Sequence, residues 1–90
     1  MKKILIKHMF AEYGDFMEYI DMYEKCTDAI AKVELKKTAE DEMHHYKRIY
    51  DILFPKLAPG AAPWTEMESG LYDHATHLYH DMEHRLANLK

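Results

Sequence analysis

The sequence has little glycine or proline and a single cysteine. Three glycines and three prolines occur among 90 residues, so few positions force a helix to end. The one cysteine, Cys26, excludes an internal disulfide and is typical of a protein from a reducing compartment. With 48% apolar and 31% charged residues, the composition predicts an ordered, helix-rich protein.

The sequence also lacks a basic excess and a long apolar run. The formal net charge is −4 with acids and bases mixed along the chain, whereas nucleic acid requires a basic face. No apolar stretch approaches the roughly 20 residues of a membrane span. Lys7 and His8 interrupt the first apolar run after three residues, which is too short for a signal peptide. We therefore expect a cytoplasmic protein that binds neither nucleic acid nor a membrane.

The length predicts a single domain over residues 1–90. A chain of this size buries only about 60–65% of its unfolded surface, so it is marginally stable alone and gains stability by associating. We expect a homodimer or a higher homo-oligomer.

The first predicted helix covers residues 2–25. Side chains at spacings of three and four form one continuous stripe along it, and all but one of them are apolar or aromatic. The stripe consists of Leu5, Met9, Glu12, Phe16, Ile20 and Tyr23. Glu12 is the exception, in the middle of the stripe.

The second predicted helix covers residues 28–54. Thr27 suits its N-cap, Asp28 suits its first turn, and Pro55 ends it. Its stripe is again apolar with a polar interruption, which here is formed by Glu42 and His45 on adjacent turns. The stripe consists of Ala31, Leu35, Thr38, Glu42, His45, Ile49 and Ile52.

The third predicted helix begins with the capping-box pattern of Thr65 to Glu68 and runs to the end of the sequence, after a Pro- and Gly-containing loop over residues 55–63. Its apolar row has a gap that either His74 or Ala75 fills. The row consists of Met67, Leu71, Leu78, Met82, Leu86 and Leu89. A polar row beside it consists of His74, His77, Asp81 and His84.

Two helices joined by a tight turn pack antiparallel. If the turn is centred on Thr27, Glu12 lies fifteen residues before it (27 − 12) and Glu42 fifteen after it (42 − 27). At a rise of about 1.5 Å per residue, both lie roughly 22 Å from the turn. His45 is one turn further on, on the same face as Glu42. The sequence therefore predicts three polar side chains at one height in an otherwise apolar seam.

Converging carboxylates need a partner. Burying an unpaired carboxylate costs several kcal/mol, and two of them repel unless a proton or a cation lies between them. A divalent cation removes the repulsion, and a Glu/His ligand set suits iron, manganese or zinc. The alternative is that Glu12 and Glu42 lie at the edge of the stripe and that His45 is a satisfied core histidine.

A Glu on one helix with Glu-x-x-His on its antiparallel partner resembles half of the di-iron site of the ferritin-like superfamily. Phe10-Ala11-Glu12, together with residues 41–45, is similar to the rubrerythrin and encapsulated-ferritin branches, and the resemblance covers about residues 5–54. It implies an all-α, ferritin-like antiparallel hairpin with a third C-terminal helix. It also implies that Glu12, Glu42 and His45 are iron ligands, with one Glu bridging two irons.

A complete site of this kind needs two halves, and the third helix carries no second Glu-x-x-His. Its nearest approach is residues 81–84. The encapsulated ferritins resemble this case, because there a two-fold dimer completes the site from two short chains. The resemblance therefore implies a four-helix bundle completed by dimerisation, two irons per dimer, and a protein shell among the partners.

His74 and His77 fall near the height of the predicted site when residues are counted across the loop. They are candidates for extra ligands, for hydrogen-bond partners of the ligands, or for a metal entry path. The alternative is a solvated polar face on a terminal helix.

The resemblance implies a ferroxidase-type oxidoreductase that oxidises Fe(II) to Fe(III) with dioxygen or peroxide. One alternative is a rubrerythrin-like peroxide reductase, which the absence of a Cys-x-x-Cys electron-transfer module disfavours. A second alternative, from another class, is a metal-free helical interaction module.

Overall fold

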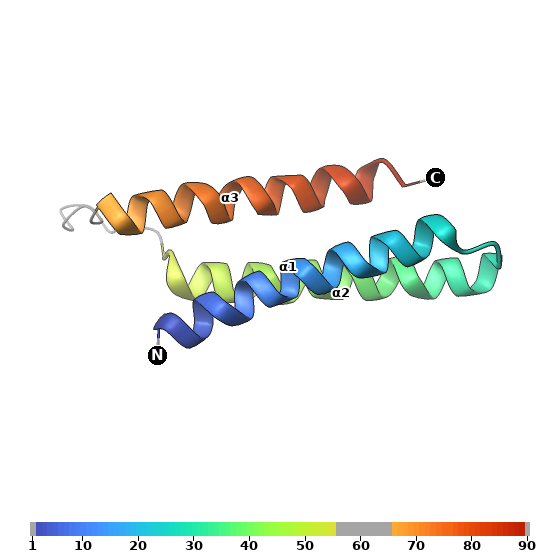
Figure 1. Cartoon of the computed structure of the whole chain (residues 1–90), viewed down its shortest axis with the longest axis horizontal. Helices are drawn as coiled ribbons and strands as arrows, with labels where there is room; N and C mark the ends of the chain where they lie inside the picture. Colours follow the sequence, from blue (N-terminus) through green and yellow to red (C-terminus); the bar gives the residue numbers. More distant parts are fainter. Residues whose placement is uncertain (1, 56–65, 90) are drawn as a thin grey trace.

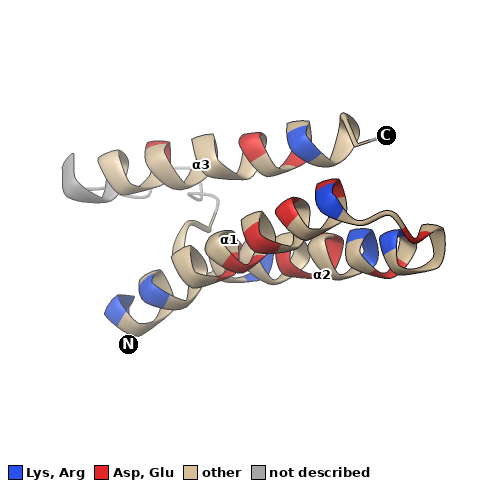
Figure 2. Ribbon diagram, turned by 45° about the vertical axis from the view of Figure 1, so that its right-hand side comes forward, with Lys and Arg blue, Asp and Glu red and all other residues tan. Residues whose placement is uncertain are grey.

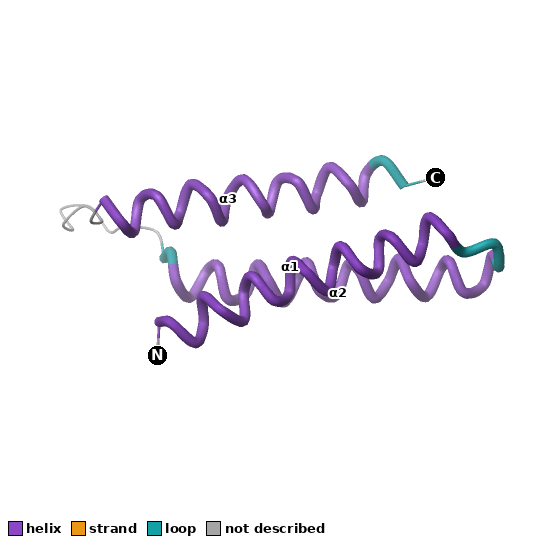
Figure 3. The backbone as a smooth tube through the Cα atoms, in the orientation of Figure 1, coloured by secondary structure: helices purple, strands orange, loops and turns teal. Residues whose placement is uncertain are grey.

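The computed structural model describes residues 2–55 and 66–89, with the side chains of residues 66–68 left out, and this part of the chain is entirely helical. It contains α1 (Lys2–Lys25), α2 (Ala29–Leu53) and α3 (Glu66–Ala87), with no strand in the described residues (Figures 1 and 3). The predicted all-α class is confirmed, and α1 has the predicted bounds. The predicted capping residue Thr65 lies outside the described residues, and α3 ends at Ala87 instead of continuing to the end of the sequence.

The turn between α1 and α2 is capped by Asp28. Its backbone is extended (φ −86°, ψ 120°), and its side chain accepts a hydrogen bond from the backbone N–H of Ile30 at 3.3 Å. The predicted N-cap, Thr27, was therefore wrong by one residue. Both residue types cap helices well, so sequence alone does not choose between neighbours. At the other end, Phe54 donates its backbone N–H to Tyr50 at 2.8 Å just before Pro55.

The core between α1 and α2 follows the predicted stripe on α1 but not on α2. Met9, Phe16 and Ile20 are buried, as expected. On α2 the fully buried side chains are Ala39 and Tyr46, whereas Ile52 is 63% exposed. Because α2 packs against both other helices, its buried line turns toward α3, and the predicted row lies along the edge that faces α1.

The third helix runs back along the hairpin and contacts both of its helices (Figure 1). Ala75 and Met82 are its buried residues, while His74 is exposed, so Ala75 fills the gap in the apolar row. The hydroxyl of Tyr46 donates to the carbonyl of Ala75 at 2.6 Å, and the hydroxyls of Tyr50 and Thr76 lie 2.6 Å apart. Large phenol side chains from the hairpin thus hold α3 in place.

The molecule is elongated, with extents of 52 × 23 × 17 Å and a radius of gyration of 15.3 Å. A compact chain of this length has a radius of gyration of about 12 Å. None of the three described helices contains an apolar stretch of the length that crossing a bilayer requires.

Candidate metal centre

The structure brings Glu12, Glu42 and His45 together on the hairpin. Glu12 lies on α1 between the turns of Met9 and Phe16, and Glu42 and His45 lie one turn apart on α2. One ligand atom from each residue lies within 4.8 Å of the other two. We call these three residues the Glu–Glu–His cluster. It is the one group of three or more His, Cys, Asp or Glu side chains that meets this criterion among the described residues.

One oxygen of Glu12 is buried without a hydrogen-bond partner in the described structure. This atom, Oε2, lies 3.6 Å from Nδ1 of His45, which is too long for a good hydrogen bond. The Glu12 side chain is 21% exposed and that of His45 is 50% exposed. A buried carboxylate oxygen left unsatisfied is costly, so its lone pairs are available to a cation.

Glu42 holds a proton close to neutrality. Its pKa is raised to about 7, first by a hydrogen bond with Glu12, then by burial, and then by the negative charges of Glu12, Asp15 and Asp41. Without a cation, the two glutamates therefore share a proton between them. A cation bound there replaces that proton.

The donor set fits a divalent transition metal. Oxygen and nitrogen ligands at about 2.0–2.2 Å from one ion lie about 3–4 Å from each other, close to the observed 3.6 Å between Glu12 and His45. Two carboxylates and one imidazole suit iron, manganese or zinc. Three protein ligands leave coordination positions open, and half-exposed His45 marks the side from which solvent reaches them.

Half-exposed His45 is the member of the Glu–Glu–His cluster that solvent reaches most easily. Tyr46 points to α3, where it meets Ala75. Successive helical residues differ by about 100° around the axis, so His45 points about 100° to one side of Tyr46, whereas Glu42, four residues before Tyr46, lies only about 40° from it. His45 therefore lies away from the face of α2 that meets α3, and Glu42 lies close to that face.

His74 and His77 are not part of the cluster. The ring of His74 lies 5.6 Å from that of Phe10, which places it near the predicted height, but on the exposed surface of α3. His77 is exposed, and its charge acts on Asp81. Their role as ligands stays a prediction.

Sequence reasoning missed the acidic surroundings of the cluster. Asp15 and Asp41 both act electrostatically on Glu42. Along α1, acidic residues recur at every third position over residues 12–24 with no Lys or Arg between them (Figure 2). The regular spacing of these acidic residues was the feature of the sequence that could have revealed the acidic surroundings. The negative charge favours the approach of cations to this part of the hairpin.

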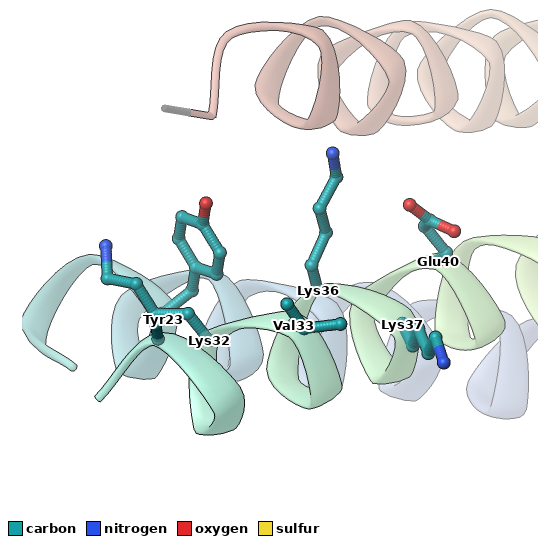
Figure 4. Close-up of a pocket in the computed structure, with 7 residues that line it drawn as sticks. Tyr23, Lys32, Val33, Lys36, Lys37 and Glu40 are labelled. Atoms are coloured by element: carbon teal, nitrogen blue, oxygen red, sulfur yellow. The ribbon is translucent and has the colours of Figure 1, made fainter. Parts of the chain in front are cut away.

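A hollow lies nearer the turn of the hairpin than the Glu–Glu–His cluster does, and lysines predominate in its lining (Figure 4). Its volume is about 530 Å³, and its lining is Tyr23, Ala29, Lys32, Val33, Lys36, Lys37 and Glu40. Lys32 sits 4.3 Å from the centre of the Tyr23 ring, and Lys36 points toward α3. Three ammonium groups make this hollow unsuitable for a metal cation.

Compared with models of protein families, with curated proteins and with solved structures, the chain matches none. The ferritin-like interpretation therefore depends on the chain's own residues.

Proposed function

We propose that the chain is a di-iron carboxylate protein of the ferritin-like type, which binds iron between two subunits and oxidises Fe(II) to Fe(III). The convergence of Glu12, Glu42 and His45 carries the proposal, because it includes a buried carboxylate oxygen without a hydrogen bond. A cation satisfies that oxygen and removes the repulsion between the glutamates.

Each residue of the cluster has a defined task. Glu12 and Glu42 supply the negative charge that stabilises the ferric product more than the ferrous substrate. Glu42 gives up its proton when the ion arrives, and His45 completes the donor set from the solvent side. Iron supplies the electrons, and dioxygen or peroxide accepts them.

A second copy completes the proposed site. One chain offers three protein ligands, and two irons need about twice that number. His45 is half-exposed to solvent, and exposed apolar side chains lie beyond the cluster on both helices of the hairpin. Ile4 is 60% exposed and Ile52 is 63% exposed, which gives a partner apolar surface to cover. A two-fold axis there repeats the three ligands without any new motif.

Metal binding by the untagged protein tests the proposal. We expect Glu42→Ala or His45→Ala to remove most bound iron and most Fe(II) oxidation, measured by elemental analysis and by ferric absorbance. Glu18→Ala is the matched control, because Glu18 is an exposed acid on α1 outside the cluster, and it should retain both. Full iron binding in Glu42→Ala would refute the ligand assignment.

One observation favours a metal-free helical interaction module as a second candidate. Glu42 is held protonated near neutrality by Glu12, so the pair has a stable arrangement without metal. In that case the exposed Ile30, Val33 and Ile52 would serve a protein partner instead. The two candidates differ in the metal content of protein purified without a metal-binding tag.

A further inference from the structure

The space between the turn end of the hairpin and the end of α3 is lined by lysines. The hollow of about 530 Å³ has Lys32 and Lys36 in its lining, and both side chains are half-buried. Their ammonium groups and the hydroxyl of Tyr23 point to the same side, toward the end of α3 (Figure 4). An adjoining hollow of about 290 Å³ shares Tyr23 and Lys32 and is lined on its other side by Asn88 and Leu89. We call the two hollows together the lysine cleft.

The two lysines that face this cleft form no ion pair with a carboxylate of the described residues. Lys32 lies 4.3 Å from the centre of the Tyr23 ring, and Lys36 has no hydrogen bond, ion pair or ring contact in the described part of the chain. Lys37 differs, because it points away from α3 and lies 3.9 Å from the Glu34 carboxylate (Figure 4). Half-buried ammonium groups without a counter-ion favour the binding of an anion.

The acidic side chains of the lysine cleft leave room for that anion. Glu40 lines only the larger hollow, one turn beyond Lys36, and Glu24 lines only the smaller one. The N-terminus of α2, at Ala29, adds a partial positive charge on the side away from Glu40. An anion is therefore best placed between Lys32 and Lys36.

The remaining walls of the lysine cleft are apolar, and they are too extensive for a simple ion. Ala29 and Val33 form the surface of α2 beside the lysines, and Val33 is 54% exposed. The larger hollow has a volume within the range of about 300–1,000 Å³ that is typical of sites for small organic molecules. From position 29 to position 36 the helix rises by about 10 Å, which is close to the length of an extended chain of eight carbons. The cleft thus suits an anion that has an apolar body.

We propose that the lysine cleft binds a small organic anion with an apolar body, such as a medium-chain carboxylate. The ammonium groups of Lys32 and Lys36 hold the carboxylate, and the chain lies against Val33 and the ring of Tyr23. The bound anion contacts α2 and also Leu89 beyond α3, so it holds the end of α3 against the hairpin. This site is separate from the Glu–Glu–His cluster, and its occupancy does not depend on iron.

Titration of the isotope-labelled full chain with sodium octanoate tests the proposal, with a chelator present so that bound metal contributes nothing. Backbone amide chemical shifts report the affinity and the place of binding. We expect saturable shifts over residues 29–36 and at residues 88–89. Acetate has the charge without the chain, and 1-octanol has the chain without the charge, so each should bind roughly tenfold more weakly or worse. Equal affinity for octanoate and for either of these compounds would overturn the proposal.

Substitutions of single lysines test the charged part of the site. We expect Lys36→Gln and Lys32→Gln each to weaken octanoate binding by roughly fivefold or more. Lys25→Gln is the matched control, because it removes the same charge from the same end of the hairpin. Lys25 pairs with Asp21 at 2.9 Å and lines neither hollow, so this variant should bind as the wild type does. Unchanged binding in both Lys36→Gln and Lys32→Gln would refute the site.

The place of binding separates the lysine cleft from the exposed apolar surface elsewhere. Ile4 and Ile52 are exposed far from the cleft, and an apolar chain that merely coats the protein would shift amides around them instead. That pattern would show the proposal to be wrong. Hydrogen exchange gives an independent measure, because octanoate in the cleft should slow the exchange of amides over residues 84–89 in the wild type and much less in Lys36→Gln. No slowing there would contradict a ligand held between α2 and the end of α3.

Discussion

In the metal-free protein, Glu42 keeps its proton up to nearly neutral pH. Its pKa is raised from 4.5 to about 7 by the hydrogen bond with Glu12 and by burial. A carboxyl group with a raised pKa in the folded state stabilises that state most at low pH. This contribution is lost as the pH rises from the unfolded value through about 7.

We therefore expect metal-free protein to be more stable at pH 5 than at pH 8. Glu42→Gln keeps a donor toward Glu12 but cannot ionise, so its Tm should vary less over this range and should exceed that of the wild type at pH 8. Thermal unfolding with a chelator present measures both effects. Glu18→Gln should keep the pH dependence of the wild type, and an equally steep dependence in Glu42→Gln would contradict the assignment.

Gly14 is a second residue with a clear consequence. It lies in the middle of α1, and a Cβ built on it has no atom within 4 Å. Glycine inside a helix is less favourable than alanine by about 0.8–1.0 kcal/mol. We expect Gly14→Ala to raise the free energy of unfolding by about 1 kcal/mol, as measured by urea denaturation. A loss of stability would indicate that another chain packs closely on this part of α1.

At the scale of elements, the contact between α3 and the hairpin depends on a small residue. Ala75 is fully buried, and its carbonyl accepts the hydrogen bond of Tyr46. The larger side chain in Ala75→Leu should force the helices apart and lower the free energy of unfolding by about 1–3 kcal/mol. Ala87→Leu, at an exposed position of the same helix, should change it by less than about 0.5 kcal/mol. Chemical denaturation followed by circular dichroism compares the two.

The hairpin could be predicted from the sequence because its information is local. The stripe of α1, the turn near Thr27 and the equal heights of Glu12 and Glu42 all follow from helical spacing over residues 5–54. The cap at Asp28 was missed because two neighbouring residues suit the same position. The exposure of Ile52 was missed because spacing shows that a helix has an apolar face but not how many neighbours share it.

The placement of α3 could not be predicted in the same way. Counting residues across the loop predicted the height of His74 along the hairpin, and its ring contact with Phe10 agrees with that height. Such a count does not tell on which side of the hairpin the third helix lies. Tyrosine hydrogen bonds and the buried Ala75 decide that side. The hydrogen bond from the hydroxyl of Tyr13 to Asp81 joins residues 68 positions apart, so no local pattern announces it.

At the scale of the whole molecule, the proposed site links metal binding to association. If two chains complete the site, iron binds to the dimer and not to the monomer. Iron binding therefore shifts the equilibrium between monomer and dimer toward the dimer. Analytical ultracentrifugation with and without Fe(II) should show this shift, with two irons per two chains. A monomer that holds two irons by itself would show that one chain completes the site.

Two isoleucines provide a matched pair for this test. Ile52 lies two turns beyond His45, and Ile30 lies at the far end of α2 and is 78% exposed. We expect Ile52→Asp to weaken the association and Ile30→Asp to leave it unchanged.

The sparse attachment of α3 has a consequence for how the molecule opens. The two helices of the hairpin pack along their length, whereas α3 is held mainly by aromatic side chains around Ala75 and Met82. Regions with few buried contacts unfold locally at lower free energy than the rest of a domain. Backbone amides of α3 should therefore exchange with deuterium faster than those of α1 and α2. Metal bound to Glu12, Glu42 and His45 joins only the hairpin helices, so it should widen this difference.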